Sequence, residues 1–97
     1  MTSAQTILEQ LGGHKFTVMT GAKDFVSGDG LTFGLPRGAA RNKSTKVRIE
    51  LQANDTYRVT FMKFKKLDLI EISKHDDVYA DRLCWLFERE TGLYTRL

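Results

Sequence analysis

The spacing of apolar residues predicts a short helix at the start of the chain. Between Ser3 and Leu11 the apolar positions recur every three or four residues, which is the period of an amphipathic helix; they are Ala4, Ile7, Leu8 and Leu11. Thr2 or Ser3 can cap its first turn, and Gly12 follows its last residue. We expect this helix to open the fold and to bury one face.

Alternation of apolar and polar residues predicts strands in the next part of the chain. In residues 15–20, "KFTVMT", Phe16, Val18 and Thr20 share one side, which is typical of a half-buried strand. Residues 21–30, "GAKDFVSGDG", predict a turn-rich connection with at most one helical turn around 23–26. In "LTFGLP" the apolar face of a further strand consists of Leu31, Phe33 and Leu35, and Pro36 ends the pairing.

The clearest strand signal is a hairpin between Thr45 and Phe64. A three-residue loop at Ala53, Asn54 and Asp55 keeps the apolar positions of both strands on one face, whereas a two-residue loop would set Leu51 against Arg58. The preferred register pairs Leu51 with Tyr57, Ile49 with Val59, Val47 with Phe61 and Glu50 with Arg58.

A second reversal at Lys65 and Lys66 leads into "LDLIEIS", where the alternation breaks at Leu69 and Ile70 and indicates a bulge or burial on both faces. A final helix is predicted with Asp76 and Asp77 at its start and Gly92 at its end. Its core-facing residues are Tyr79, Ala80, Leu83, Leu86 and Phe87. The sum is an α+β fold: one domain over residues 1–97 with an N-terminal helix, an antiparallel meander of four or five strands, and a C-terminal helix packed on the sheet.

Composition agrees with a single globular domain. The chain has 97 residues, 41% of them hydrophobic and 28% charged, and no apolar stretch long enough for a membrane span or a secretory signal. Its one cysteine, Cys84, excludes an internal disulfide, which fits a reducing compartment. We expect a cytoplasmic protein.

The positive charge of the chain is local. The net charge is +3, and the segment "RGAARNKSTKVR" at residues 37–48 holds five basic residues and no acid. Without it the chain would be slightly acidic, so this segment is where an anionic partner would be attracted.

This segment and the adjacent strand face predict a site for nucleic acid. We expect phosphate contacts from Arg37, Arg41, Lys43, Lys46 and Arg48, with support from Arg58, Lys63 and Lys65, and Lys66 can extend the surface. Met62 and Phe64 lie nearby and could stack an unpaired base. The alternative is that these charges only keep a solvated face soluble and prevent sheets from associating.

Trp85 carries a second hypothesis, in which the final helix binds a protein. It lies well outside the apolar stripe of that helix and is flanked by Arg82 and Arg89, and Trp and Arg are enriched among residues that dominate protein interfaces. In the alternative interpretation the ring lies flat on a neighbouring strand, with the arginine stems over it.

No motif predicts catalysis, a metal or a cofactor. "GAARNKS" imitates the end of a nucleotide-binding loop, but Asn42 stands where the second glycine is needed. His75, Asp76 and Asp77 are better explained by a helix start than by a metal, and His14 and Cys84 form no evident nucleophilic pair. We therefore predict a protein that is not an enzyme and that needs no cofactor.

The strings "MTGAKDF" and "ETGLYTRL", together with "LTFGLP" and "DTYRVTFMK", resemble a family of small proteins encoded by bacteriophages and prophages. The resemblance implies a phage accessory protein acting in the bacterial host cytoplasm, and it supplies no active-site residues. For such a protein the partner that we expect first is nucleic acid. The alternative partner is a host protein, such as a defence or transcription component that the chain inhibits or modulates.

Overall fold

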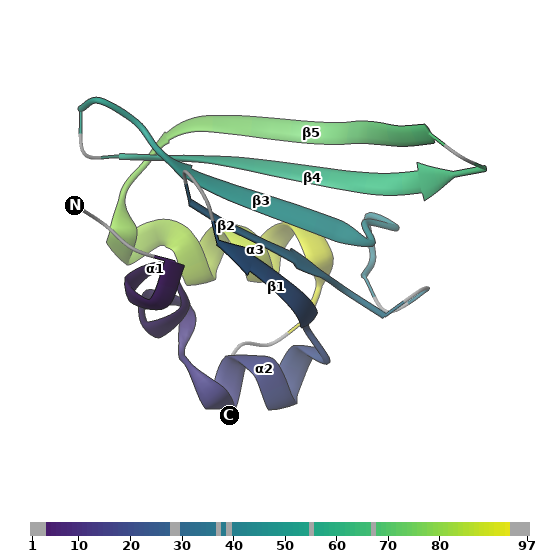
Figure 1. Ribbon diagram of the computed structural model, residues 1–97, viewed down its shortest axis with the longest axis horizontal. Helices are drawn as coiled ribbons and strands as arrows, with labels where there is room; N and C mark the ends of the chain where they lie inside the picture. The colour runs from purple at the N-terminus through teal and green to yellow at the C-terminus, as the bar shows by residue number, and fades with distance from the viewer. Residues whose placement is uncertain are drawn as a thin grey trace.

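The computed structural model describes residues 4–27, 30–36, 38, 40–54, 56–66 and 68–93. Over these residues the chain forms helices and a five-stranded antiparallel sheet whose strands follow the chain order (Figure 1). The elements are α1 (Ala4–Leu11), α2 (His14–Thr20), β1 (Lys23–Ser27), β2 (Gly30–Gly34), β3 (Lys46–Leu51), β4 (Tyr57–Lys65), β5 (Asp68–Val78), the 3-10 turn η1 (Ala80–Arg82) and α3 (Leu83–Thr91). The predicted α+β meander is confirmed.

All three α-helices lie on the same side of the sheet, and the opposite face carries no helix of the described chain (Figure 1). The core fills the space between the two layers. At its centre Phe16 of α2 packs edge-on against Phe33 of β2 and Phe87 of α3, with ring centroids 5.4 and 5.1 Å apart. Such aromatic pairs add about 0.5–1.5 kcal/mol each beyond the burial of their area. This cluster therefore holds both helices on the sheet and leaves the other face open.

The predicted β3–β4 hairpin is confirmed in its register. Leu51 lies opposite Tyr57, Ile49 opposite Val59 and Val47 opposite Phe61, and Glu50 faces Arg58 on the other side. The Gln52 amide donates to the Thr56 carbonyl at 2.7 Å, which closes the turn beyond Leu51. Asp55, in this turn, lies outside the described residues, as do the proposed caps Thr2 and Ser3.

The prediction of a strand over residues 15–20 is wrong, because this segment is helix α2. Phe16 and Thr20 are buried, whereas Val18 is 65% exposed, so the buried positions are four residues apart. The Thr20 hydroxyl donates to the Phe16 carbonyl at 2.7 Å. Gly21 ends the helix with a left-handed φ of 74°. Burial of Phe16 in the aromatic cluster favours a helix here, and the segment is too short for its apolar pattern to distinguish a helix from a strand.

The connection predicted over residues 21–30 is also wrong, because it contains strand β1 and no helical turn. β1 pairs with β2 through Lys23 opposite Gly34 and Val26 opposite Thr32, with a bulge between them where Asp24 has a φ of 57°. All five residues of β1 are exposed at the edge of the sheet. An exposed edge strand has no buried face to produce an alternating pattern.

β5 is longer than predicted and takes in the residues assigned to the start of the final helix. Leu69 and Ile70 are exposed and regularly paired, and the bulge falls instead at Ile72, between the pairs of Phe61 with Ser73 and Met62 with Glu71. Asp76 and Asp77 belong to the strand. The Arg58 Nε donates to Asp76 Oδ1 at 2.7 Å across from β4, and the Asp77 amide donates to Gln52 Oε1 at 2.8 Å. These long-range contacts replace the predicted capping role.

Helix α3 is shorter at its start but ends as predicted. Gly92 follows it with a φ of 73° and donates its amide to the Glu88 carbonyl. Leu83, Leu86 and Phe87 are buried as expected, while Ala80 is half-buried and Tyr79 is 64% exposed, so Tyr79 is not a core residue. No helix among the described residues has the length and apolar character needed to cross a membrane.

Candidate functional site

The open face of the sheet contains a trough along β2. Since side chains alternate between the two faces of a strand, and Leu31 and Phe33 are buried, β2 directs Thr32 and Gly34 toward the open face, and Gly30 has the same phase along the strand. Their partners on β3 are Glu50, Arg48 and Lys46, respectively. Small residues of β2 thus form the floor of the trough, and the longer polar side chains of β3 form one of its walls.

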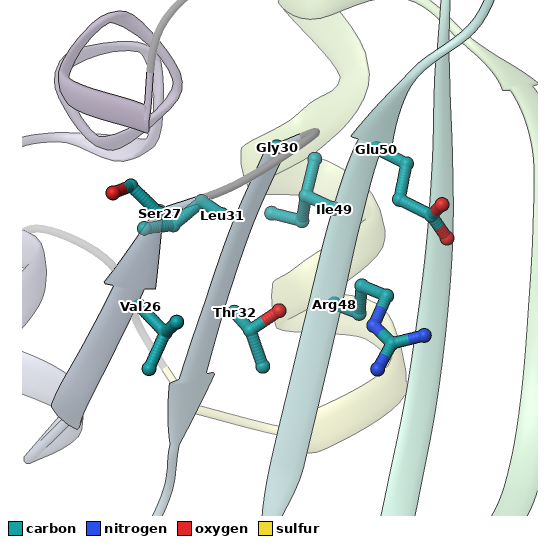
Figure 2. A pocket seen from close by; sticks show the side chains of 8 residues that line it. All are labelled: Val26, Ser27, Gly30, Leu31, Thr32, Arg48, Ile49 and Glu50. Carbon is teal, nitrogen blue, oxygen red and sulfur yellow. The ribbon is translucent and has the colours of Figure 1, made fainter.

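A hollow of about 240 Å³ lies over the Gly30 end of this trough (Figure 2). Val26, Thr32 and Arg48 line up across the three neighbouring strands in Figure 2, and Glu50 lies further along β3. The hollow therefore offers a methyl-bearing wall, a hydroxyl, a guanidinium and a carboxylate. We call it the Gly30 hollow.

A larger hollow of about 600 Å³ lies at the other end of the trough. Val26 lines both hollows, so they adjoin along β2. The larger one is lined by Lys23, Asp24, Val26, Gly34, Leu35, Thr45, Lys46, Phe64 and Lys66. Three lysines and one acid thus surround an otherwise small and apolar floor.

Phe64 separates this hollow from a third one. The third hollow, of about 470 Å³, shares Thr45 and Phe64 with the second and is also lined by Gly38, Ala40, Arg41, Lys43 and Lys63. Phe64 is 58% exposed, and Lys46 Nζ lies 5.6 Å from its ring centroid. We call these two adjoining hollows the Phe64 site. The side chains lining it include six cations and one acid, Asp24.

The described part of the basic loop has a fixed conformation. Ser44 is fully buried, and both its amide and its hydroxyl donate to Asn42 Oδ1, at 3.1 and 2.7 Å. The Lys43 amide donates to the Ala40 carbonyl at 3.0 Å, and Lys43 has a φ of 66°. This tight turn holds the backbone while the Lys43 side chain stays exposed.

The structure brings together Lys43, Lys46 and Lys63 at the Phe64 site and places Arg48 at the Gly30 hollow. Among the described residues, no carboxylate forms an ion pair with any of these four cations. Strand alternation places the Lys63 side chain on the same side of β4 as Phe61 and on the opposite side from Phe64. Lys63 therefore belongs to the Phe64 site only through the third hollow, which it lines. Arg37 and the Lys65 side chain lie outside the described residues.

Arg58 and Arg41 have structural partners. Arg58 pairs with Asp76, and this hydrogen bond and the Asp76 charge raise the pKa of the Arg58 guanidinium above its ordinary value. The Arg41 amide donates to the Thr91 carbonyl at 2.6 Å, and its guanidinium covers Gly92, where an added Cβ would lie 3.0 Å from Nε. A cation at the C-terminal end of α3 is favourable to the helix dipole. Both arginines are therefore less available to a ligand than predicted.

Sequence reasoning missed Lys23 and the glycine trough. Lys23 was placed in a connection, and only its pairing in β1 brings it to Phe64. The signal for the trough was present in the sequence: Gly30, Thr32 and Gly34 occupy alternate positions of a strand whose other positions are apolar.

Trp85 forms a separate surface on α3. The residue is 51% exposed, and the guanidinium carbons of Arg82 and Arg89 lie 5.9 and 5.1 Å from its ring centroid. A hollow of about 320 Å³ beside it is also lined by the exposed Tyr79 and by the end of β5. The arginines flank the ring as predicted, and the ring is open to solvent.

Two further candidate side chains, His75 and Cys84, make contacts between elements of the fold. His75 Nε2 lies 2.5 Å from Glu90 Oε1, which ties β5 to α3. The Cys84 thiol donates to the carbonyls of Gln10 and Leu11 at the end of α1. Across the described ranges, no three His, Cys, Asp or Glu side chains are grouped so as to hold a metal ion.

Comparison with known proteins gave no match to a family model, to a curated protein or to a solved structure.

Proposed function

We propose that this chain is a non-enzymatic nucleic-acid-binding protein of phage origin, which contacts phosphates through the Phe64 site and Arg48. The observation that carries the proposal is an exposed aromatic ring among cations that have no carboxylate partner in the described chain. Aromatic rings with surrounding cations bind nucleic acid by stacking bases and neutralising phosphates. The phage origin rests on the sequence resemblance alone.

The number of available cations sets the expected strength. The four predicted cations that the structure brings to these hollows, Lys43, Lys46, Arg48 and Lys63, can engage about four phosphates, so they should contribute about −2.8 for a single strand or −3.6 for a duplex to the slope of log Kobs against log salt concentration. Between about 50 and 200 mM salt the affinity then drops roughly 50-fold or more. Binding is therefore moderate and strongly dependent on salt.

The test is fluorescence anisotropy with a labelled oligonucleotide at several salt concentrations. A variant carrying Lys43→Ala, Lys46→Ala and Arg48→Ala should weaken binding and make the salt slope shallower by about 2 to 3. Arg41 is left unchanged, because its removal would disturb the end of α3. The matched control is Lys15→Ala on the exposed side of α2, which removes one charge from the other layer and should leave the slope unchanged.

Negligible binding of the unmodified protein at about 50 mM salt would exclude this function. So would a triple variant that binds as tightly as the unmodified protein.

A second candidate function, modulation of a host protein, is favoured by the exposure of Trp85 between two arginines. In this case Trp85→Ala should remove a partner captured from host lysate, with Val18→Ala as the control for loss of an exposed apolar group. A partner retained equally by Trp85→Ala would remove Trp85 from this candidate.

A further inference from the structure

We infer that the ligand of the open face is an unpaired nucleic-acid strand, which stacks one base on Phe64 and runs along the β2 trough into the Gly30 hollow. This inference rests on the proposed function and names the form of nucleic acid that the site accepts. It is carried by three features of the open face: the exposed ring, the glycine floor and the order of charges along the trough.

The first feature is the accessibility of Phe64. Phe64 is more than half exposed, and it lines two hollows. A base can reach this ring only if its own face is free. In a duplex each base lies between its neighbours, and extracting one costs a few kcal/mol. An unpaired strand presents its bases at much smaller cost, and stacking on an aromatic residue is tolerant of sequence.

The second feature is the floor of the trough. Gly34 adds no side chain beside Thr32, and the position that a Cβ would take there is 3.6 Å or more from its neighbours, so a ligand can approach the β2 backbone at this end, between the walls formed by β1 and β3. At Gly30 the β3 backbone itself packs against β2, because the Ile49 carbonyl oxygen lies 2.0 Å from the position of an added Cβ. The two glycines are four residues apart, or about 13 Å at the rise of a strand. The trough is therefore long enough to guide a flexible chain from the Phe64 site to the Gly30 hollow.

The third feature is the order of charge. Lys23, Lys46 and Lys66 surround the wide end of the trough, where phosphates are attracted. At the narrow end Glu50 lies opposite Gly30, further along β3 than Arg48 (Figure 2), and its carboxylate would repel a phosphate. The same carboxylate can accept hydrogen bonds from the amino groups of a base, while the Thr32 hydroxyl can donate one. The Gly30 hollow is thus suited to a base edge between Glu50 and Thr32, and Arg48 contacts the adjoining phosphate.

The experiment compares a single strand of about 16 nucleotides with a duplex of the same length, by anisotropy at low salt. We expect tighter binding of the single strand. Phe64→Ala should weaken single-strand binding roughly 5- to 150-fold, Phe64→Tyr should retain it, and neither should change duplex binding appreciably. Val18→Ala, which removes an exposed apolar side chain from the helical layer, is the matched control and should bind like the unmodified protein.

Two further variants test the path and the stacking directly. Gly34→Val should fill the trough and weaken single-strand binding, and its melting temperature shows whether the fold is retained. Trp85 is the only tryptophan of the chain, so Phe64→Trp in a Trp85→Phe background places a single fluorophore at the proposed stacking position. Its emission should be quenched by the single strand and not by the duplex.

The outcomes separate the two proposals. Failure to bind either nucleic acid at low salt would overturn both. A different set of results would overturn this inference and leave the proposed function standing. In that case duplex and single strand bind equally, Phe64→Ala has no effect, and the variant at Lys43, Lys46 and Arg48 clearly loses affinity. Unquenched emission at position 64 with the single strand bound would also overturn it.

Discussion

Replacing Gly30 with alanine should destabilise the fold, although the change adds only one methyl group. An added Cβ would lie 2.0 Å from the Ile49 carbonyl oxygen and 2.9 Å from the Glu50 Cα. Both neighbours are backbone atoms of β3 in the middle of the sheet, so relief requires β2 and β3 to move apart. Substitutions of this kind typically cost about 1–3 kcal/mol, and the stiff backbone puts Gly30→Ala in the upper part of that range.

A second glycine on the same strand provides the matched control. An added Cβ at Gly34 would lie 3.6 Å from the carbonyl oxygens of Lys23 and Thr45, which is ordinary contact. Gly34→Ala should therefore fold without strain and gain about 0.4–1 kcal/mol, because alanine reduces the freedom of the unfolded chain. Gly30→Ala has the same favourable effect on the unfolded chain, so its net loss in the free energy of unfolding is about 2 kcal/mol.

The assay is urea denaturation, with thermal melting as a second measurement. We expect Gly30→Ala to melt roughly 8–16 °C below the unmodified protein, and Gly34→Ala to melt slightly above it. If the free energy of unfolding of Gly30→Ala falls within about 0.5 kcal/mol of the unmodified value, the argument from close backbone approach is refuted.

Two further predictions concern the attachment of the helices. Phe16→Ala should lower the free energy of unfolding by about 3–5 kcal/mol, because Phe16 is fully buried against Phe33 and Phe87; a loss below about 1 kcal/mol in urea denaturation would contradict the role given to this ring cluster. Glu90→Gln should cost about 1 kcal/mol in the same assay, because it weakens the contact with His75, and an unchanged value would mean that this contact does not hold α3 to β5.

The strands of the central hairpin could be predicted to the residue because two constraints agree. The apolar faces of β3 and β4 must both point to the core, and the loop length allows only one such register. The segments around this hairpin lack such agreement. In residues 15–20 the spacing of Phe16 and Thr20 fits either a strand or a helix, and the choice depends on the contacts of Phe16 with distant rings.

The final helix shows how a local signal can be outweighed by a distant partner. Two adjacent acids before an apolar stripe are typical of a helix start. Here Asp76 instead pairs with Arg58 from the neighbouring strand, and Asp77 Oδ1 accepts a hydrogen bond from the side-chain amide of Asn54 in the β3–β4 turn. Those partners are 18 and 23 residues away, and no local pattern contains them.

The candidate site was predictable in its charge and not in its shape. The cluster around Lys43, Lys46 and Arg48 is visible in the sequence, because these residues lie close together along the chain. The sequence alone could not tell that Arg41 covers the end of α3, or that Lys23 of the edge strand β1 lines the same hollow as Phe64. Both facts depend on strand pairing and on the path of the loop.

The interruptions in β5 have a consequence for self-association. This strand is 11 residues long and has no strand beyond it in the described sheet, so it offers backbone groups to which another chain could add. The register shifts at Ile72 and near Asp77 break the row of regularly spaced groups, and the charges of Lys74 and Asp76 lie along it. We therefore expect concentrated solutions to remain free of fibrils, even though Leu69 and Ile70 are exposed near the strand's beginning.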